Sequence, residues 1–376
     1  MKRWLMPLIA VAVAASSLDA LPKFATRQGA KCQSCHINPS GKGMRSTFGS
    51  TYGREELTMT TFKERTDIEE FSPALNDVFT IGMDYRTLFY YMQSTTATSF
   101  FQMQGDLYLD LRLNKKFRIY FDKGLYSGFE VFGLAKVLPL DGYVKVGNFI
   151  PAYGLRMDDH TLFIRNGPFA PIDPALSAYP AGLGFGQGSE DTGLEVGFNP
   201  SIFTFNAGVF NGRKGGLAGA GGSTSKAVAV RGDAAFEAGP FNILLGGSLY
   251  RLPTGGGRVT QSWGGFGIVT YDGNLTLMAE ADMIQSYNTS LLRTVNGVVI
   301  FTEANYVITE GIDLKVGYEF YDPNDARQDA SVSRISVGAE FFPLTGVEVR
   351  PVYRINRESL TELSNDELHV MFHFFL

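Results

Sequence analysis

The chain of 376 residues has only two cysteines, Cys32 and Cys35. Because they lie three positions apart, they cannot cross-link a protein of this length, and a disulfide-stabilised fold is excluded. Long apolar runs are also missing. After the first 20 residues, no stretch approaches the roughly 20 consecutive apolar residues that a membrane-spanning helix requires. A helical membrane protein is therefore not expected.

Charged residues are scarce, and they form no basic cluster. They make up 19% of the chain, and the formal net charge is −5. Without a basic footprint, nucleic acid is not an expected partner. The chain is instead rich in glycine and aromatic residues, with 43 Gly, 30 Phe and 17 Tyr. This composition suits strands joined by tight turns and predicts a large all-β protein.

The N-terminus has the pattern of a secretory signal peptide. Two basic residues precede an apolar stretch from Trp4 to Ala15, and small residues follow up to Ala20. An uncleaved anchor is the alternative, but the run is too short for a membrane helix and Pro7 interrupts it. We therefore expect residues 1–20 to be removed on export.

From Asn76 to the C-terminus, apolar and polar residues alternate with period two. In segment 106–114 every odd position is Leu, and segments 312–320 and 347–355 alternate in the same way. Each strand would have one apolar and one polar face. A membrane barrel with a polar lumen and a soluble sandwich with a polar exterior both fit this alternation.

The number and length of the strands favour the barrel. Most of the expected strands exceed the five or six residues usual in soluble sheets. They lie at 76–92, 100–114, 117–125, 129–138, 143–154, 189–198, 203–212, 227–238, 241–252, 259–271, 275–287, 296–308, 312–322, 332–342, 347–357 and 366–376. Sixteen strands, with tight links alternating with longer ones, predict an antiparallel outer-membrane β-barrel over residues 76–376. Fourteen strands would result if 117–138 formed one strand and the pairing around 213–226 changed.

The last residues form an apolar ladder of Leu368, Val370, Phe372, Phe374 and Leu376. This ladder is similar to the terminal strand of outer-membrane barrels, although those usually end in Phe. A buried terminal strand in a soluble sheet is the alternative.

The segment at 21–75 carries the only chemical motif. Cys32, Cys35 and His36 form the Cys-x-x-Cys-His pattern of covalent haem c attachment, in which two thiols bind the vinyl groups and the histidine becomes an axial iron ligand. A CxxC disulfide or dithiol and half of a zinc site are the alternatives. A zinc site would need further ligands.

Residues 21–36, with Pro22 and Phe24 shortly before the cysteines, resemble the opening of the fused monohaem cytochrome-porins, a family of outer-membrane iron oxidases. The resemblance implies one haem c on Cys32, Cys35 and His36, a porin-like barrel, oxidation of extracellular Fe(II), and a periplasmic c-type cytochrome as partner. Residues 38–44 depart from that family, which leaves the electron donor open. Segment 144–154 resembles a strand and turn of bacterial porins.

The sixth iron ligand is not determined by the motif. Met44 is the first candidate because it follows His36 by eight residues, although a packing role is the alternative for any methionine. His369 and His373 are further candidates, because they have the parity opposite to the terminal ladder and should point inward. Polar residues that merely line a lumen would show the same parity.

Segment 21–75 is small for an independent core around a macrocycle. We therefore expect it to lie in the lumen or to cap the periplasmic mouth of a barrel in the outer membrane.

The long links carry many carboxylates, which could attract ferrous ions or could simply be solvated surface charge. They are Asp158 and Asp159 beside His160, and Asp173, Glu190, Asp191, Asp322, Asp325, Asp329, Glu358, Glu362, Asp366 and Glu367. No hydrolase or nucleotide-binding motif is present.

A haem inside a barrel suggests electron transfer across the outer membrane. Enzymatic oxidation of Fe(II) is one possible form of this transfer. One haem cannot cover about 30 Å of membrane, so a partner must approach closely. Two alternatives stay open: a solute-diffusion porin gated or plugged by the haem segment, and a scaffold barrel that docks multihaem cytochromes.

Overall fold

The computed structural model describes residues 22–59, 72–125, 128–159, 161–167, 179–212, 225–288 and 290–376. The expected signal peptide lies outside these residues. Within the described ranges, no helix is both long and apolar enough to cross a membrane.

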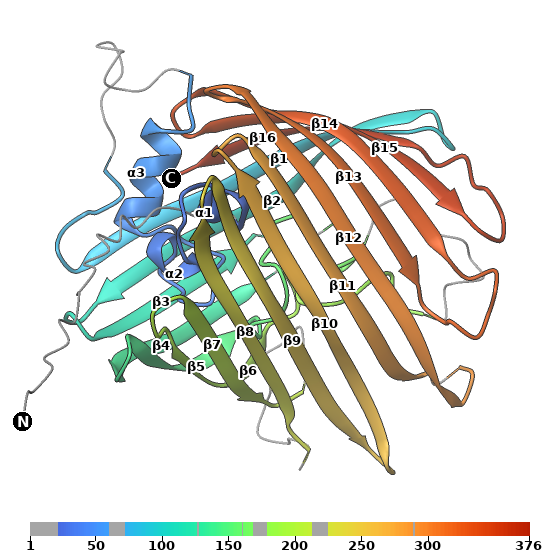
Figure 1. Cartoon of the computed structure of the whole chain (residues 1–376), viewed down its shortest axis with the longest axis horizontal. Coiled ribbons are helices and arrows are strands. Elements are labelled where there is room, and N and C mark those ends of the chain that lie inside the picture. Colours follow the sequence, from blue (N-terminus) through green and yellow to red (C-terminus); the bar gives the residue numbers. More distant parts are fainter. Residues whose placement is uncertain are drawn as a thin grey trace, which may run out of the picture.

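Sixteen antiparallel strands form one closed barrel, in which each strand pairs with its neighbours in sequence and β1 pairs with β16 (Figure 1). The strands are β1 (Phe79–Met92), β2 (Ala97–Arg112), β3 (Phe117–Gly124), β4 (Phe129–Leu138), β5 (Gly142–Phe149), β6 (Asp191–Phe198), β7 (Phe203–Phe210), β8 (Ala227–Ala238), β9 (Phe241–Gly255), β10 (Arg258–Tyr271), β11 (Leu275–Asn288), β12 (Arg293–Thr309), β13 (Ile312–Asp322), β14 (Val332–Leu344), β15 (Val347–Glu358) and β16 (Glu367–Phe375). The all-β barrel of sixteen strands is thus confirmed. Segment 117–138 does form two strands, which rules out the fourteen-strand alternative.

The two faces of the wall differ as the alternation predicts. On β2, Leu107 is 62% exposed on the outer face, whereas its neighbour Tyr108 is 2% exposed on the inner face. On β16, Phe374 is exposed and His373 is buried. An apolar exterior around a polar interior is the surface that a barrel presents to lipid.

The links differ between the two ends of the barrel. At one end, here called the short-turn end, all links are short: 113–116, 139–141, 199–202, 239–240, 272–274, 310–311 and 345–346. At the far end they range from 256–257 to 150–190, so the expected alternation of short and long links holds only in part. β1 begins and β16 ends at the short-turn end.

Residues 22–59, here called the plug, contain three helices: α1 (Pro22–Arg27), α2 (Cys32–Cys35) and α3 (Thr47–Glu55). Figure 1 shows the plug at the short-turn end of the barrel. Its side chains contact inward-facing side chains of the wall there. Nζ of Lys23 donates to the Asn305 side chain at 3.2 Å, and Nζ of Lys31 donates to the carbonyl of Phe203 at 2.8 Å.

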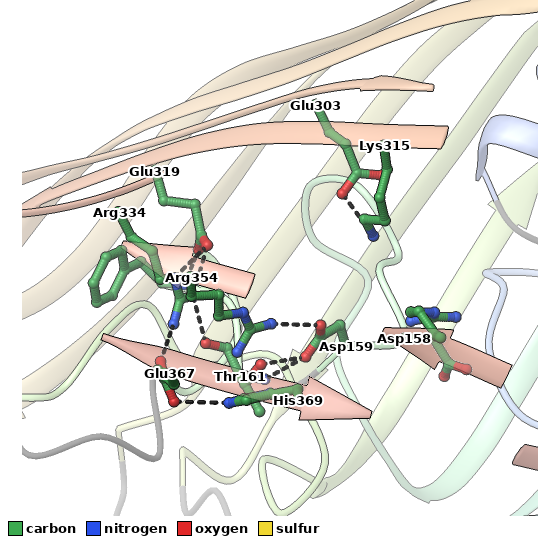
Figure 2. Close-up of polar contacts among 12 residues, drawn as sticks. Asp158, Asp159, Thr161, Glu303, Lys315, Glu319, Arg334, Arg354, Glu367 and His369 are labelled. Carbon is green, nitrogen blue, oxygen red and sulfur yellow. Dashed lines mark hydrogen bonds and ion pairs between the residues drawn. The ribbon is translucent and has the colours of Figure 1, made fainter. Parts of the chain in front are cut away.

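The link between β5 and β6 folds into the barrel instead of extending from it. Its described parts, 150–159, 161–167 and 179–190, are here called the inner loop. Arg165 is fully buried and pairs with Glu280 of β11 at 3.1 Å. In Figure 2, Arg354 of β15 reaches Asp159 of the loop, at 3.0 Å. The inner loop and the plug meet where Arg156 donates to the carbonyl of Gly41 at 3.3 Å.

Candidate functional site

The Cys-x-x-Cys-His motif forms one helical turn followed by an extended residue. Cys32 and Cys35 are the first and last residues of α2, so their side chains lie three positions apart on one face of the turn. His36 leaves the helix with φ −113° and ψ 146°, and it forms an isolated antiparallel bridge with Arg45. The sequence thus places the thiols and the imidazole next to each other.

Because of this bridge, the neighbouring side chains lie on two opposite faces of a short hairpin. His36 and Arg45 are paired, and both line one lumenal cavity. Ile37 and Met44 are the next pair, joined by a 3.0 Å backbone hydrogen bond, and both belong to the buried aromatic core that includes Tyr120. Met44 therefore lies on the opposite face of this short hairpin from His36.

The hairpin turn fixes the orientation of the His36 ring. Nδ1 of His36 lies 3.1 Å from the carbonyl oxygen of Gly43. A carbonyl can only accept, so Nδ1 carries the proton and the lone pair lies on Nε2. A hydrogen bond of this kind from the other ring nitrogen is what orients a histidine that ligates a metal.

Gly41, Lys42 and Gly43 make this turn with three successive positive φ angles, 86°, 68° and 69°. A side chain at Gly43 would also collide with the wall, because a Cβ there would lie 2.2 Å from the Tyr120 hydroxyl. That hydroxyl accepts a hydrogen bond from the backbone N–H of Met44 at 2.9 Å. The Gly-Lys-Gly sequence therefore shapes the turn that holds His36.

A cavity in the lumen lies beside His36, between the plug and the barrel wall. Its apolar lining comes from the plug and the barrel wall, and its polar lining comes from the plug, the wall and the inner loop. The lining residues are Phe24, His36, Lys42, Gly43, Arg45, Gly49, Tyr52, Gly53, Leu57, Asp84, Arg86, Arg156, Asp158, Phe342, Glu348, Arg350, His373 and Phe375.

Helix α3 forms one wall of this cavity through two glycines a turn apart, Gly49 and Gly53. A Cβ at Gly49 would lie 2.4 Å from the carbonyl oxygen of Cys35 and 3.0 Å from its Cα. Backbone atoms cannot move aside cheaply, so only glycine allows α3 to pack this closely on α2. The cavity owes its position beside the motif to this contact.

Positive charge is in excess around the cavity. Its lining contains five cationic side chains, Lys42, Arg45, Arg86, Arg156 and Arg350, and three carboxylates, Asp84, Asp158 and Glu348. Burial, together with the nearby Arg156, lowers the pKa of Lys42 to about 7. An anionic ligand would relieve this crowding of cations.

These features fit a haem. The cavity has apolar walls for a macrocycle and cations for its two propionates, and His36 has the tautomer that an axial ligand needs. Neither cysteine belongs to the lining, so a haem on both thiols would extend from the adjacent α2 turn into the cavity. Burial raises the pKa of the Cys32 thiol, although charge from Arg231 acts in the opposite direction.

The three candidate sixth ligands lie in different surroundings. His373 lines the same cavity as His36, and its ring lies between two carboxylates, 2.9 Å from Asp84 and 2.8 Å from Glu348. His369 lines a separate cavity and contacts Glu367 at 2.7 Å. Met44 faces the aromatic core described above.

The expectation that the link carboxylates are solvated surface charge is wrong for several of them. Glu190, Asp191 and Glu367 are buried, at 4%, 0% and 0% exposure. Asp158 and Asp159 form ion pairs with Arg86 and Arg354 on the barrel wall. The inner loop turns Asp158 and Asp159 inward, where these arginines compensate their charges. Asp325 is exposed as expected, and His160 and Asp173 lie outside the described residues.

Sequence reasoning missed two parts of this site. The acceptor for His36 is a backbone carbonyl, which leaves no trace in residue type. The arginines that line the cavity come from the plug, β1, β15 and the inner loop, and only the closed topology brings them together. Among the described residues, no cluster of three or more His, Cys, Asp or Glu side chains could hold a metal ion.

Comparison with known proteins identifies the fold. No protein-family model matches the chain, and no curated protein matches it significantly. Several solved structures have similar folds. The outer-membrane protein OmpT of Vibrio cholerae matches with a TM-score of 0.56 and 14% identity, over 80% of this chain and 100% of that one. OmpF of Salmonella typhi matches with a TM-score of 0.55 and 12% identity, over 79% of this chain and 97% of that one, and OprB of Pseudomonas putida with a TM-score of 0.57 and 12% identity, over 86% and 100% of the two chains. The chain therefore has the fold of a porin-like β-barrel. At these identities the likeness concerns the fold alone.

Proposed function

We propose that this protein is an outer-membrane barrel of the porin type, plugged at its short-turn end by a segment that carries one haem c, and that this haem passes electrons across the outer membrane. The observation that carries the proposal is the position of His36. It follows two suitably spaced cysteines and lines a cavity in the barrel lumen.

When bound, the haem supplies a one-electron redox couple. Cys32 and Cys35 would hold it covalently, and His36 would be its iron ligand, oriented by the hydrogen bond to the carbonyl of Gly43. The cations of the cavity would neutralise its acidic groups, and aromatic side chains would keep water away from it. These side chains are Phe24, Tyr52, Phe342 and Phe375.

Both chain ends of the barrel lie on the plug side, where every link between strands is short, and in outer-membrane barrels the short turns face the periplasm. The haem segment therefore sits near the periplasmic mouth. A periplasmic c-type cytochrome is the partner that we propose on that side. On the outer side we propose an electron donor or acceptor such as Fe(II), which must reach into the lumen because one haem cannot cover about 30 Å.

The test is a visible spectrum of the membrane-extracted protein, produced together with haem c maturation, before and after addition of Fe(II) under argon. Reduced c-type bands that appear with iron are the expected result. A covalent haem that dithionite reduces and Fe(II) does not would exclude iron as donor. The absence of covalent haem would remove the redox proposal and leave a plugged porin.

A solute-diffusion porin gated by the plug is the second candidate, and two observations favour it. The fold is shared with porins, and the plug is held by ion pairs that could break. This candidate predicts conductance in planar bilayers that changes with the redox state of the haem. Conductance that stays low in both states would exclude it.

A further inference from the structure

One part of the short-turn end carries a concentration of basic side chains that the haem cavity does not use. Arg112 ends β2, Lys115 and Lys116 lie in the turn 113–116, Arg118 is the second residue of β3, and Lys136 lies near the end of β4. These five residues are here called the basic mouth. They lie on adjacent strands, where Arg112 pairs with Arg118 in register and the N–H of Lys136 donates to the carbonyl of Lys116 at 2.8 Å.

Negative charge does not balance the basic mouth. Two carboxylates, Asp110 and Asp141, act electrostatically on Lys136. Asp110 is fully buried, and its ion pair with Arg118 is long, at 3.5 Å. Lys115, Lys116 and Lys136 are exposed. The basic mouth therefore projects net positive charge into the water beyond the short-turn end.

The basic mouth borders the lumen rather than the lipid. Arg112, Arg118 and Lys136 have the inward parity of their strands, whereas Leu113 and Phe117 form the outer surface with 56% and 44% exposure. Side chains with inward parity at the end of a barrel face its aqueous opening. This orientation favours a soluble partner over lipid head groups.

A short chain of contacts joins the basic mouth to the haem motif. Arg118 and Tyr120 are successive inward residues of β3. The Tyr120 hydroxyl accepts from the N–H of Met44, and the carbonyl of Gly43 accepts from Nδ1 of His36. A protein docked on the basic mouth would lie beside the hairpin that holds the proximal ligand.

We infer that the basic mouth is the docking surface for a soluble redox protein with an acidic face. This inference rests on the proposed electron-transfer function and adds the chemistry of the partner and its place of contact. Opposite charges on two proteins increase their encounter rate by about 10 to 10³ at low ionic strength and define their orientation.

The experiment uses the haem-loaded full chain in nanodiscs of neutral phospholipid. A reduced, acidic [2Fe–2S] ferredoxin serves as the probe donor, and haem reduction is followed by stopped-flow absorbance over a range of salt concentrations. The test variant carries Lys115→Glu, Lys116→Glu and Lys136→Glu. The matched control carries Arg258→Glu and Arg293→Glu, which reverse two exposed arginines at the far end.

We expect the native rate to fall steeply with salt, the test variant to be at least tenfold slower at low salt, and the control to equal the native protein. A basic cytochrome c used as the probe should show the opposite change. If the ferredoxin rate is the same for the native protein and the test variant, the docking inference is wrong.

Two further measurements separate the possible failures. Dithionite must reduce native protein and variants equally; a haem that dithionite cannot reduce overturns the electron-transfer proposal and not merely the docking surface. In nanodiscs with anionic phospholipid, an unchanged native rate supports docking of a protein. A native rate that drops to the value of the test variant would assign the basic mouth to lipid head groups instead.

Discussion

Nη1 of Arg27 lies 2.7 Å from Oδ2 of Asp313, and both side chains are buried at the short-turn end of the barrel. Arg27 ends α1 of the plug, and Asp313 is an inward residue at the start of β13. Lys23, one turn earlier on α1, forms an ion pair with Glu340 on β14. The first helix of the plug is therefore fastened to the wall by two ion pairs on adjacent strands.

Reversing one of these charges should loosen the plug. In Arg27→Glu, two carboxylates face each other in a buried position, and we expect the open probability in planar bilayers to rise at least tenfold, which corresponds to about 1.4 kcal/mol. The double variant Arg27→Glu, Asp313→Arg restores opposite charges and should return the conductance to its native level. Equal conductance in all three proteins would show that this pair does not hold the plug.

The contact between α3 and α2 should be sensitive to a single methyl group. Gly49→Ala places a Cβ 2.4 Å from the carbonyl of Cys35, and we expect it to cost about 1–3 kcal/mol and to lower the yield of covalent haem per protein. Gly53→Ala is the matched control, because its Cβ meets the ring of Phe375 at 3.2 Å and not backbone. Haem content and thermal unfolding measure both effects. An equal haem yield in both variants would contradict this account.

The barrel could be predicted from the sequence because strand alternation is a local signal. Each strand shows its inner and outer face in successive residues, as Leu107 and Tyr108 do. In the same way, the alternating apolar residues at the C-terminus predicted which side chains of β16 point inward and which point outward. The haem motif is local too, since Cys32, Cys35 and His36 share one turn.

The interior of the barrel could not be predicted, because it depends on contacts between distant residues. The inward fold of the inner loop rests on pairs such as Arg165 with Glu280, 115 positions apart. From sequence alone, a charged loop residue is expected to be solvated, because its buried partner is not known. The side of the hairpin that Met44 occupies depends on the His36–Arg45 bridge, which spacing along the chain does not reveal.

The inner loop should detach from the wall in acid. Burial alone would raise the pKa of Asp159, but Arg354 and the hydrogen bonds from Thr161 hold it well below its usual value. A carboxylate with a lowered pKa stabilises the fold at every pH above about 4, and this stabilisation is lost as the pH falls below that value. Asp159→Asn should therefore lower the melting temperature at pH 7 and lose this difference from the native protein in acid.

Circular dichroism melts at several pH values measure this effect, with Asp325→Asn as the control because Asp325 is exposed. If Asp159→Asn melts at the native temperature at pH 7, the Asp159–Arg354 pair does not hold the inner loop.

The sixth ligand can be assigned by comparing the three candidates in the haem-loaded protein. His373 lines the cavity with His36 and would bind the iron through a ring nitrogen released from Asp84 or Glu348, so His373→Ala should change the spin state of the ferric haem. His369→Ala and Met44→Leu should leave the spectrum unchanged, because these residues lie in another cavity and in the aromatic core. Electron paramagnetic resonance reads the spin state directly. If only Met44→Leu changed the spectrum, the sixth ligand would be Met44, on the other face of the hairpin.

The thiol of Cys32 should be slow to react in haem-free protein. Burial is the largest influence on this group, and it raises the pKa above the ordinary cysteine value despite the nearby Arg231. Only the thiolate is nucleophilic, so a raised pKa means a smaller reactive fraction at pH 8. In the Cys35→Ser variant, Cys32 is the single thiol, and its alkylation by iodoacetamide should be at least tenfold slower in the folded protein than in urea. The pH at which folded protein reaches half its maximal rate should lie above the midpoint in urea. A lower midpoint in the folded protein would mean that Arg231 and Arg156 outweigh burial and activate the thiol for attachment of the haem.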